Sequence, residues 1–559
     1  MPQTVIRWLF DRLAEAPDRT ALSVKKSGEF RPVTWRQLAD DVVRLAAALA
    51  ARGVGPQARV AQWSENRYEW IVTDFALHYL GAVHVPIHAT LTATQALYQI
   101  NHSGACWVFV SSAEMAQQLD QHAGRLESVP GWVVYEEKPL TIAGRTAQSW
   151  RQLLEGTEVR AIEPHAGSPS DLATILYTSG TTGEPKGVML SQNNLVSNVE
   201  AVLSVLPQAT DDVRLCFLPL SHIFARTCDL YTWLASGLVL ALAESRATVL
   251  ADAQAVRPTL INAVPYFYER LYRGLQEAGV GQQPQAVRQA LGGRIRLLCG
   301  GGAALPAYLF DYYQQQECPI FQGYGLTESS PVISISTPTA YRRGASGKPI
   351  PGIEVRVADD GEILTRGPHV MLGYYRDEQA TRQVIRDGWL YTGDYGKLDE
   401  DGFLYITGRK KEIIVTLGGK NVAPVLLESL LIQDPLIQQA LVVGDERKYL
   451  AALIVPDFDH LRAWMDSQGR NAPGLPLEKM LQDEHVRREY RRRIDRQLAE
   501  LSHYEQVARF VLLPRAFSIE QEEMTPKLSL RRDVICRHFA EEIEWMYSEE
   551  YEKSFPNSG

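Results

Sequence analysis

Two periods alternate in the hydrophobic and polar positions of the chain, one typical of helices and one of strands. The segment Thr34–Gln37 has the sequence of a capping box, and apolar residues follow it at helical spacing as far as Leu49, which predicts an amphipathic helix. Strand-like runs and helical stretches then alternate, as over Arg59–Trp63, Trp70–Leu80 and Trp107–Val110. Such alternation is typical of an α/β fold built on a largely parallel sheet.

Four strand-like apolar runs lead directly into loops of unusual composition. The first, Leu172–Leu176, enters a loop rich in glycine and threonine. The other three are Val213–Leu218 before Pro219–His222, Ile295–Cys299 before Gly300–Ala304, and Pro319–Phe321 before Gln322–Glu328. Ligands of open α/β sheets bind at the carboxyl ends of the strands. We therefore expect these four loops to converge on one site.

The pattern changes twice towards the C-terminus. From Gly344 onward, short turn-rich β-like segments predict a small β subdomain. The charged segment Gly408–Lys411 is typical of a linker, and an α+β pattern with two strands over Ile437–Pro456 follows it. These changes predict an N-terminal domain over 1–408 and a separate α+β domain over 409–559.

A chain of 559 residues is too long for one hydrophobic core and indicates two or more domains. Hydrophobic residues make up 45% and charged residues 22%, which is typical of globular proteins. The net charge of −9 argues against a nucleic-acid-binding surface as the main function. The sequence gives no basis for assigning an oligomeric state.

The cysteines and the apolar segments bear on location. No two of the six cysteines form a C-x-x-C pair, so we interpret them as reduced thiols in a cytoplasmic protein without a zinc site. Met1–Phe10 lacks the pattern of a signal peptide, and the apolar stretch Leu230–Ala243 is too short to span a bilayer. Peripheral contact with the inner face of a membrane stays open.

The loop after Leu172–Leu176 has the composition of a polyphosphate site. Within Tyr177–Val188 are four small hydroxyl residues (serine or threonine), three glycines and Lys186. Glycine lets the backbone approach an anion, successive N–H groups can form an anion-binding concavity, and the lysine adds a full charge. The loop is not a Walker A motif, since Pro185 precedes the lysine and Gly187 follows it. A flexible surface turn is the alternative, but the buried strand before the loop favours anion binding.

These motifs, in this order from 177 to 532, resemble those of the adenylate-forming (AMP-dependent synthetase) superfamily. Within it, the chain is similar to bacterial long-chain fatty acid–CoA ligases over nearly its whole length. The resemblance implies an α/β fold: a large N-terminal domain of two α/β sheets and a small β-barrel, joined by a hinge to a smaller, mobile α+β C-terminal domain.

The resemblance also implies a reaction in two halves. A fatty acid carboxylate attacks the α-phosphate of ATP, and the thiol of coenzyme A then displaces AMP from the acyl-adenylate. Phosphoryl chemistry depends on positioning and on cations such as Mg²⁺ rather than on a protein nucleophile. Three alternatives stay open: an acyl-AMP ligase that loads a carrier protein, an aryl-CoA ligase, and a pseudoenzyme that binds nucleotide or lipid.

By this resemblance, the N-terminal domain supplies contacts to the nucleotide and to the acyl carboxylate. The residues that match the β- and γ-phosphate loop are Thr178, Ser179, Gly180, Thr181, Thr182, Gly183 and Lys186. The residues that match the adenine and α-phosphate motifs are Gly302, Ala303, Ala304, Gln322, Gly323, Tyr324, Gly325, Thr327 and Glu328. Of these, Tyr324 would stack on adenine, Thr327 would bond the α-phosphate and Glu328 would hold Mg²⁺, while His222 matches a position near the acyl carboxylate.

Further matches lie near and beyond the linker. Asp394 matches the carboxylate that accepts both ribose hydroxyls, and Arg409 matches an arginine that contacts ribose. Lys411 matches the hinge, about which the C-terminal domain would rotate between the two half-reactions. Lys420, after two glycines, matches a loop that enters the site in the second half-reaction. Charged residues like these are otherwise ordinary surface groups.

The C-terminal lysine of the family is where this chain departs from the pattern. Long-chain ligases read approximately T-P-T-L-K-L-K-R, whereas Thr525–Arg532 places Ser529 at the position of the catalytic lysine and Lys527 two residues earlier. In an extended segment, two residues keep the same face but move the side chain by about 7 Å. We expect Lys527 to take the role, with Arg531 a weaker candidate and impaired adenylation an open alternative.

The arginine-rich segment Arg487–Arg493 lies on an expected helix. A solvated helix face is one interpretation. Contact with anionic lipid or with the phosphates of coenzyme A is the other.

Overall fold

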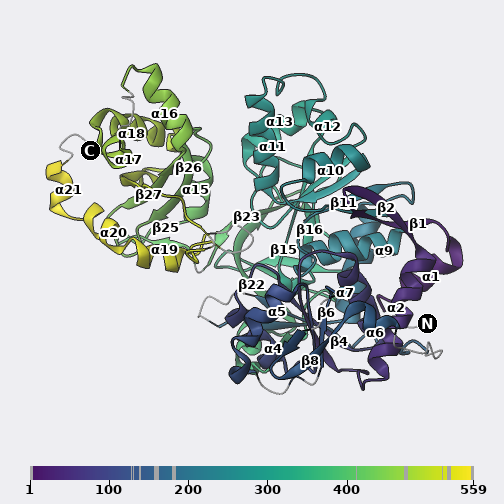
Figure 1. Ribbon diagram of the computed structural model, residues 1–559. Helices are drawn as coiled ribbons and strands as arrows, with labels where there is room; N and C mark the ends of the chain where they lie inside the picture. Colours follow the sequence, from purple (N-terminus) through teal and green to yellow (C-terminus); the bar gives the residue numbers. More distant parts are fainter. Residues whose placement is uncertain are drawn as a thin grey trace. The chain divides into compact units, whose positions relative to one another are not determined.

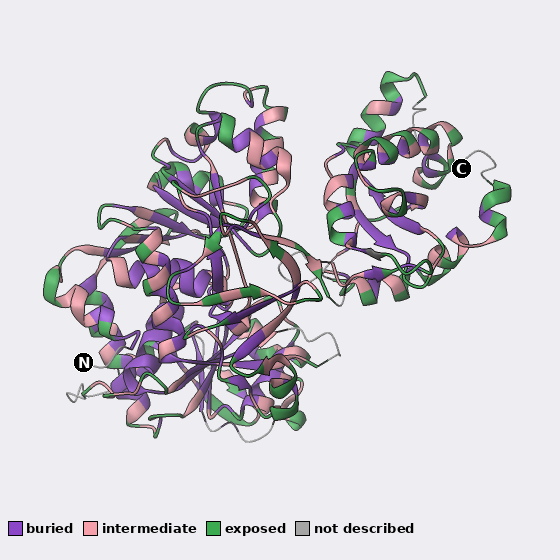
Figure 2. Cartoon of the chain, turned by 180° about the vertical axis from the view of Figure 1, so that it is seen from behind, coloured by how far each residue is buried: buried purple, intermediate pink, exposed green. Residues whose placement is uncertain are grey.

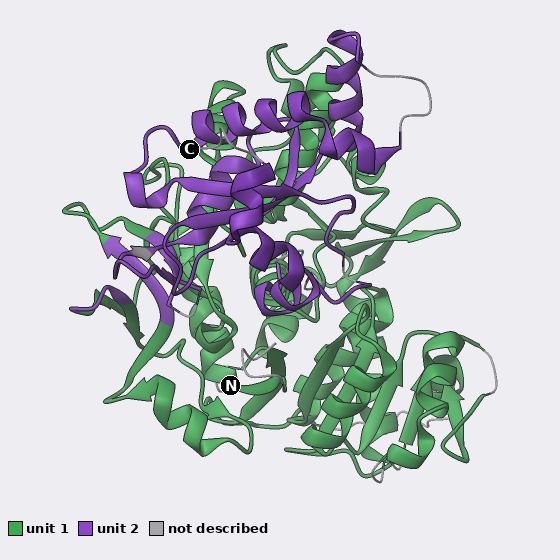
Figure 3. Cartoon of the chain, turned by 90° about the vertical axis from the view of Figure 1, so that its left-hand side faces the viewer, with its two compact units in different colours: residues 1–358, 363–392, 398–405 green, residues 359–362, 393–397, 406–559 purple. Residues whose placement is uncertain are grey.

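The computed structural model describes residues 4–126, 129, 131–137, 140–155, 163–178, 184–410, 412–470, 476–518, 520–524 and 530–554. The chain forms two compact units (Figures 1 and 3). Unit 1 comprises 1–358, 363–392 and 398–405, and unit 2 comprises 359–362, 393–397 and 406–559. The division into domains at 408 and 409 stays a prediction.

One nine-stranded sheet of unit 1, called here the β11 sheet, has the order β17-β16-β15-β14-β13-β11-β12-β1-β2. Its strands are parallel from β15 to β1 and antiparallel towards both edges. The bounds are β1 Thr20–Lys26, β2 Glu29–Thr34, β11 Val213–Cys216, β12 Val239–Leu242, β13 Leu260–Ala263, β14 Leu297–Gly300, β15 Ile320–Gly325, β16 Val332–Ile335 and β17 Lys348–Pro349.

A second nine-stranded sheet, the β9 sheet, has the order β20-β10-β9-β4-β3-β5-β6-β8-β7. It is parallel from β9 to β8, with antiparallel strands at its edges. The bounds are β3 Arg59–Ser64, β4 Val83–His88, β5 Trp107–Val110, β6 Gly131–Val134, β7 Leu140–Ile142, β8 Arg145–Ser149, β9 Leu172–Thr178, β10 Lys186–Ser191 and β20 Gly373–Tyr374. The two sheets confirm the predicted, largely parallel α/β fold.

Helices alternate with these strands. They are α1 Arg7–Glu15, α2 Trp35–Ala50, α3 Tyr68–Leu80, α4 Ala93–Ser103, α5 Ala113–Asp120, η1 Ala123–Arg125, α6 Trp150–Glu155, α7 Gln192–Val205, α8 Ile223–Ala225, η2 Arg226–Tyr231, α9 Thr232–Ser236, α10 Val249–Val256, α11 Pro265–Glu277, α12 Ala286–Ala290, α13 Ala307–Gln315, η3 Thr327–Ser329 and α14 Glu378–Val384. The predicted capping box begins α2: Gln37 N–H donates to Thr34 Oγ1 at 3.2 Å, and Thr34 N–H donates to Gln37 Oε1 at 2.9 Å.

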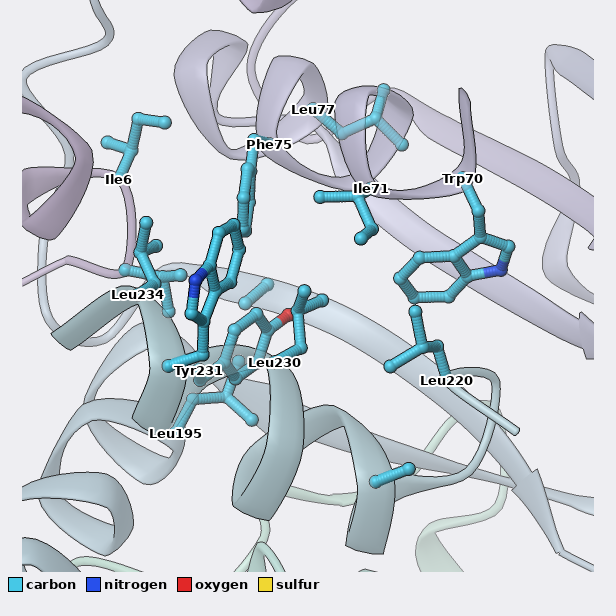
Figure 4. Close-up of a cluster of buried hydrophobic side chains, with 14 of the residues drawn as sticks. Ile6, Trp70, Ile71, Phe75, Leu77, Leu195, Leu220, Leu230, Tyr231 and Leu234 are labelled. Atoms are coloured by element: carbon cyan, nitrogen blue, oxygen red, sulfur yellow. The ribbon is translucent and has the colours of Figure 1, made fainter. Parts of the chain in front are cut away.

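Unit 1 contains several clusters of buried hydrophobic residues, and one of them lies around α3, which is buried from Trp70 to Leu80. A helix with apolar residues on every side belongs in the interior. The buried polar side chains Asp74 and His78 of α3 have hydrogen-bond partners there, His84 and Tyr231. Figure 2 shows the buried residues concentrated in the sheets and the helices packed on them. In Figure 4, Trp70, Ile71 and Phe75 of α3 lie opposite Leu230 and Tyr231 in the same cluster.

The turn-rich segment after Gly344 forms a five-stranded sheet, with the order β18-β19-β22-β21 and β23 paired to β22. This sheet occupies the region in which the resemblance implied a small β-barrel. Its bounds are β18 Glu354–Val357, β19 Glu362–Arg366, β21 Ile385–Arg386, β22 Trp389–Leu398 and β23 Leu404–Arg409.

Unit 2 has an α+β fold with its own core. The two strands expected over Ile437–Pro456 are present as an antiparallel pair, β26 and β27, and β28 lies parallel to β27. The elements are β24 Ile414–Val415, β25 Asn421–Val422, α15 Pro424–Leu431, β26 Ile437–Val443, β27 Leu450–Pro456, α16 Phe458–Ser467, α17 Leu477–Gln482, α18 Glu484–Leu498, η4 His503–Glu505, β28 Val507–Leu512, α19 Arg532–His538, α20 Ala540–Met546 and α21 Glu549–Ser554. Among the described residues, no helix is both long and apolar enough to cross a bilayer.

Three buried histidines make the stability of unit 1 depend on pH. Burial lowers the pKa of His78, His84 and His369 to about 4. Histidine in an unfolded chain takes up its proton near pH 6.5. The stability contributed by the neutral rings is therefore complete above about pH 6.5 and is lost as the pH falls towards 4, by up to ~3 kcal/mol for each histidine.

We expect the urea midpoint of unit 1 to fall as the pH is lowered from 7 to 5. The variant His369→Gln should show a smaller fall, because one of the three titrations is removed. His503→Gln, at an exposed position of unit 2, is the control and should leave the pH dependence unchanged. Urea unfolding followed by tryptophan fluorescence measures the midpoint, and a midpoint constant over this range would contradict the assignment.

Candidate functional site

The predicted phosphate loop connects β9 and β10, which form an antiparallel hairpin with Thr178 opposite Lys186. The loop therefore leads from strand to strand, and its lysine begins a strand rather than a helix. The candidate residues Ser179, Gly180, Thr181, Thr182 and Gly183 lie outside the described residues.

Lys186, Tyr374 and Glu328 form a connected cluster at the end of this hairpin. Lys186 Nζ lies 5.1 Å from the centre of the Tyr374 ring and 4.0 Å from Asp377 Oδ2. The Tyr374 hydroxyl donates a 2.9 Å hydrogen bond to Glu328 Oε1. Burial, followed by the charge of Glu328, raises the pKa of Tyr374, so its hydroxyl stays protonated and remains a donor. The phosphate-loop lysine and the proposed metal-binding carboxylate thus share one neighbour.

The segment Met371–Tyr375 brings the hairpin and the Glu328 loop together. Its strand β20 pairs with β10, and Tyr375 N–H donates to Gly187 O at 2.7 Å. At its other end, Met371 N–H donates to Glu328 O at 2.9 Å. Sequence analysis missed this segment. Its only local signal is a glycine beside two aromatic residues, and nothing local indicates its distant partners.

Aromatic side chains also support the loop end of the hairpin, and they too were missed. The Tyr98 hydroxyl donates to Pro185 O at 3.3 Å, and His102 Nδ1 lies 2.8 Å from the Tyr177 hydroxyl. The His102 ring also contacts the Tyr375 ring edge-on, with centroids 5.7 Å apart. These contacts fix both ends of the loop to α4.

The motif Gln322–Glu328 is only partly a loop, which corrects the expectation. Strand β15 continues to Gly325, because β16 pairs antiparallel with Gly323–Gly325, and η3 begins at Thr327. Every residue from Gln322 to Glu328 is half-buried, and the residues next to the motif, Phe321 and Ser329, are buried. Gly325 is obligatory, since a Cβ there would lie 1.7 Å from Pro331 O. The motif therefore presents a continuous accessible edge that includes Tyr324 and Thr327.

The predicted loop Gly300–Ala304 lies beside this motif. Gly300 pairs with Gln322 across β14 and β15, and Gln322 Nε2 donates to Ala303 O at 2.7 Å. Gly302 has a φ of +81°, a left-handed conformation that favours glycine. Gly302, Ala303 and Ala304 are all exposed, which leaves this loop accessible to a ligand.

His222 begins the short helix α8, where its Nδ1 accepts a 3.1 Å hydrogen bond from Phe224 N–H. Its ring stacks against that of His88, with centroids 6.0 Å apart and the ring planes inclined by 28°. Phe224 lies against Gly301, because a Cβ at that glycine would come within 3.1 Å of Phe224 Cζ. The His222 loop, the Gly300–Ala304 loop and the Gln322–Glu328 motif therefore lie together, as expected, and Met371–Tyr375 joins the last of them to the phosphate hairpin.

Two family profiles match the chain. The profile described as AMP-binding enzyme matches residues 9–375, and that described as AMP-binding enzyme C-terminal domain matches residues 411–551. The chain belongs to the AMP-binding enzyme family. This confirms the resemblance seen in the sequence.

Relatives of the same family match along most of the chain. Long-chain-fatty-acid–CoA ligase FadD15 of Mycobacterium tuberculosis is 34% identical, over 98% of this chain and 97% of the relative. Long-chain-fatty-acid–CoA ligase 6 of Mus musculus is 29% identical, over 88% of this chain and 79% of the relative.

Solved AMP-binding enzymes have the same fold. The anthranilate CoA ligase AuaEII, in complex with anthranoyl-AMP, superposes with a TM-score of 0.80 at 22% identity, over 97% of this chain and 99% of that one. The O-succinylbenzoate coenzyme A synthetase MenE of Bacillus subtilis, in complex with ATP and a magnesium ion, gives a TM-score of 0.74 at 25% identity, over 94% of this chain and 98% of that one.

For an AMP-binding enzyme, Asp394 and Arg409 are the candidate ribose contacts, and both lie in unit 2. Asp394 is 3% exposed, and its Oδ1 lies 3.3 Å from Nε of Arg409, whose side chain is mostly exposed. The next residue, Lys410, donates to Asp360 at 2.6 Å and to Glu362 at 2.8 Å. These contacts hold the chain in place as far as Lys410. The next residue, the predicted hinge Lys411, lies outside the described residues.

The remaining candidates of unit 2 lie in a hairpin and in an undescribed segment. Lys420 is at the turn between β24 and β25, where its Nζ lies 5.7 Å from the centre of the Tyr504 ring. Lys527 and Ser529 lie outside the described residues. The residues that flank them, Met524 and Leu530, form an antiparallel bridge.

The arginines of α18 pair largely with carboxylates of unit 2. Arg492 and Arg493 donate to Glu489, and Arg493 also donates to the buried Asp434 at 2.7 Å. Arg488 contacts Glu484, four residues earlier. This pairing favours a solvated helix face over a surface that binds anions.

Metal binding at Glu328 would depend on the nucleotide. Within the described ranges, no group of three or more His, Cys, Asp or Glu side chains could hold a metal ion. Mg²⁺ in nucleotide sites is bound by one or two carboxylates together with substrate phosphates. The half-buried carboxylate of Glu328 fits that requirement.

Proposed function

We propose that this AMP-binding enzyme is a medium- to long-chain fatty acid–CoA ligase. In the first half-reaction an oxygen of the fatty acid carboxylate bonds to the α-phosphorus of ATP, and pyrophosphate leaves. In the second, the sulfur of coenzyme A bonds to the acyl carbon, and AMP leaves as the thiol proton is released. The 34% identity to a long-chain-fatty-acid–CoA ligase over 98% of the chain supports this substrate class.

The observation that carries the proposal is the cluster of Lys186, Tyr374 and Glu328. A polyphosphate needs a cation, and a magnesium ion bound to it needs a carboxylate. Lys186 begins the strand after the phosphate loop, and the Tyr374 hydroxyl orients the Glu328 carboxylate. The cluster therefore offers both charges at the end of one hairpin.

In this proposal Thr178, the loop 179–183 and Lys186 hold the β- and γ-phosphates. Tyr324 stacks on adenine beside the exposed Gly302–Ala304 loop, and Thr327 donates to the α-phosphate. Asp394 and Arg409 hold the ribose. Mg²⁺ at Glu328 would neutralise charge that develops on the phosphates.

His222 and Lys527 act on the acyl side of the proposed reaction. His222 lies near the fatty acid carboxylate, and Lys527 bridges that carboxylate and the α-phosphate. Rotation about Lys411 then replaces the Lys527 segment with the Lys420 loop for the attack by coenzyme A.

Acyl chain length would be selected by burial of the tail, at about 0.8 kcal/mol for each methylene. We further propose a cytoplasmic location with peripheral contact at the inner membrane face, where fatty acids partition. The paired arginines of α18 give no support to that helix as the contact surface.

The test is acid-dependent pyrophosphate release with ATP, Mg²⁺ and acids of graded length, followed by mass spectrometry of the products with coenzyme A. We expect release to rise with chain length into the medium or long range, and an acyl-CoA product. Preference for aromatic acids would indicate an aryl-CoA ligase, and acyl-AMP without acyl-CoA would indicate loading of a carrier protein. ATP binding without pyrophosphate release would indicate a pseudoenzyme.

A further inference from the structure

A π-helix, η2 (Arg226–Tyr231), directly follows the short helix that begins at His222. The N–H of Thr232 donates to the carbonyl of Thr227, five residues earlier, which is the hydrogen bond of a π-helix. π-helices are rare and occur frequently at functional sites. The contacts of η2 indicate what this one does.

One side of η2 is fixed to the β11 sheet. The carbonyl of Cys228 accepts hydrogen bonds from Thr232 Oγ1 at 2.6 Å, from Asn262 Nδ2 at 2.9 Å and from the Arg214 guanidinium. Arg214 also forms a buried ion pair with Asp229, at 3.6 Å. Side chains of β11 and β13 thus satisfy a carbonyl that an α-helix would pair with Thr232 N–H.

The other side of η2 is fixed to the β9 sheet through Arg226, which is fully buried. Its guanidinium contacts the buried Asp74, donates to Thr174 Oγ1 at 2.8 Å and lies 2.9 Å from His84 Nδ1. Its backbone N–H donates to His222 O at 3.0 Å. Since Thr174 lies on β9, one residue links the His222 helix to the strand that enters the phosphate loop.

The residue after Arg226 links η2 to a third part of the site. Thr227 Oγ1 donates to Ser330 O at 3.0 Å. Ser330 closes the turn that contains Glu328, because its N–H donates to Thr327 O at 3.3 Å. Successive residues of η2 therefore contact the strand of the phosphate loop and the turn with the proposed metal carboxylate.

Apolar packing keeps η2 in one place. Leu230 and Tyr231 are fully buried and pack against Trp70, Ile71 and Phe75 of α3 (Figure 4). A helix packed in this way holds its polar contacts in fixed positions, because protein interiors have few voids into which it could shift.

From these contacts we infer that Arg226 and Thr227 are positioning residues, which align the acyl-carboxylate side of the site at His222 with the phosphate strand and the Glu328 turn. The inference rests on the proposed function. Alignment matters for the first half-reaction, in which two separate substrates must meet. It matters less for the second, in which carboxyl and phosphate are already joined by a covalent bond.

The main test compares Arg226→Lys with Arg214→Lys. Both arginines are buried, and each pairs with a buried aspartate: Arg226 of η2 with Asp74 of α3, and Arg214 of β11 with Asp229 of η2. Arg214 therefore joins η2 to the β11 sheet, whereas Arg226 joins it to β9. Lysine keeps the charge and loses the planar fork. Because a misplacement of about 1 Å can cost ~10²-fold, we expect Arg226→Lys to lower the kcat of adenylation by about ten- to a hundredfold. Arg214→Lys should stay within about threefold of wild type, because Thr232 and Asn262 still donate to the carbonyl of Cys228. The contacts of Arg226 and Thr227 with Thr174 and Ser330 are also kept.

The control within each variant is the second half-reaction, started from preformed acyl-adenylate and coenzyme A. We expect Arg226→Lys to keep the rate of this second half-reaction within about threefold of wild type. In the first half-reaction, its KM for ATP should be unchanged. Rates are divided by the folded fraction from circular dichroism. Equal loss of both half-reactions, or equal loss in Arg226→Lys and Arg214→Lys, would show a merely structural role and overturn the inference.

A second pair of variants, with smaller changes, provides the test if Arg226→Lys does not fold. Thr227→Val removes the hydroxyl that donates to Ser330 O. Thr232→Val removes a buried hydroxyl that donates to Cys228 O and accepts from Arg214, so its contacts lie on the side of the β11 sheet. Loss of one hydrogen bond predicts a roughly two- to tenfold lower adenylation rate for Thr227→Val and less change for Thr232→Val. Equal adenylation rates in Thr227→Val and Thr232→Val would contradict the positioning role of Thr227. Wild-type protein without acid-dependent pyrophosphate release would instead refute the proposed function itself.

Discussion

Replacing Glu328 with glutamine is expected to lower magnesium-dependent pyrophosphate release by about 10²–10³-fold, the usual effect of removing one group that stabilises a developing charge. The amide keeps the shape of the side chain and accepts the hydrogen bond from Tyr374, whose hydroxyl lies 2.9 Å from Glu328 Oε1. What it loses is the negative charge that a hard divalent cation requires. The defect should therefore lie in kcat and in the Mg²⁺ concentration needed for half-maximal rate.

The matched control is Glu378→Gln, on the nearby helix α14. Its side chain is 78% exposed and pairs with Arg382, so its charge is in water and the rate should not change. Tyr374→Phe should fall between the two variants, since it removes the hydrogen bond that orients the carboxylate but leaves the charge. Steady-state pyrophosphate release over a magnesium titration measures all three. A Glu328→Gln enzyme with the magnesium dependence of wild type would contradict the assignment.

The sequence predicted those parts of the fold that depend on local pattern. The capping box at Thr34 begins a helix, and the apolar run at Leu172 is a strand, because both depend on neighbours within a few residues. The same holds for the hairpin over Ile437–Pro456. Gly302 was assigned through the family motif, and its left-handed backbone in the structure gives a physical reason for a glycine at this position.

The missed features depend on partners far apart in the sequence. Tyr374 becomes part of the site through a hydrogen bond to Glu328, 46 residues away, and through pairing of its short strand with β10. The motif at Gln322 was expected as a loop, but pairing with β16 extends the strand through it. No local sequence pattern marks the π-helix, because its wide turn is stabilised by hydrogen bonds from the distant residues Arg214 and Asn262 to the carbonyl of Cys228.

The second large effect concerns Lys527. We expect Lys527→Ala to lower adenylation by about 10²–10³-fold, because a charge that bridges the carboxylate and the α-phosphate stabilises the transition state of that step alone. Thioester formation from preformed acyl-adenylate should stay within about threefold of wild type, since pyrophosphate has already left. The two half-reactions are measured separately, by pyrophosphate release and by mass spectrometry of the acyl-CoA.

Ser529 supplies both the control and the test of register. Ser529→Ala should leave adenylation unchanged if Lys527 has the role, and loss of activity in Ser529→Ala would assign the role to that position. The double variant Lys527→Ala with Ser529→Lys places the lysine where long-chain ligases have it. Two residues along an extended segment move a side chain by about 7 Å on the same face, so recovery in the double variant would show that both positions reach the same place. Lys527→Ala with undiminished adenylation would show that another residue bridges the two substrates.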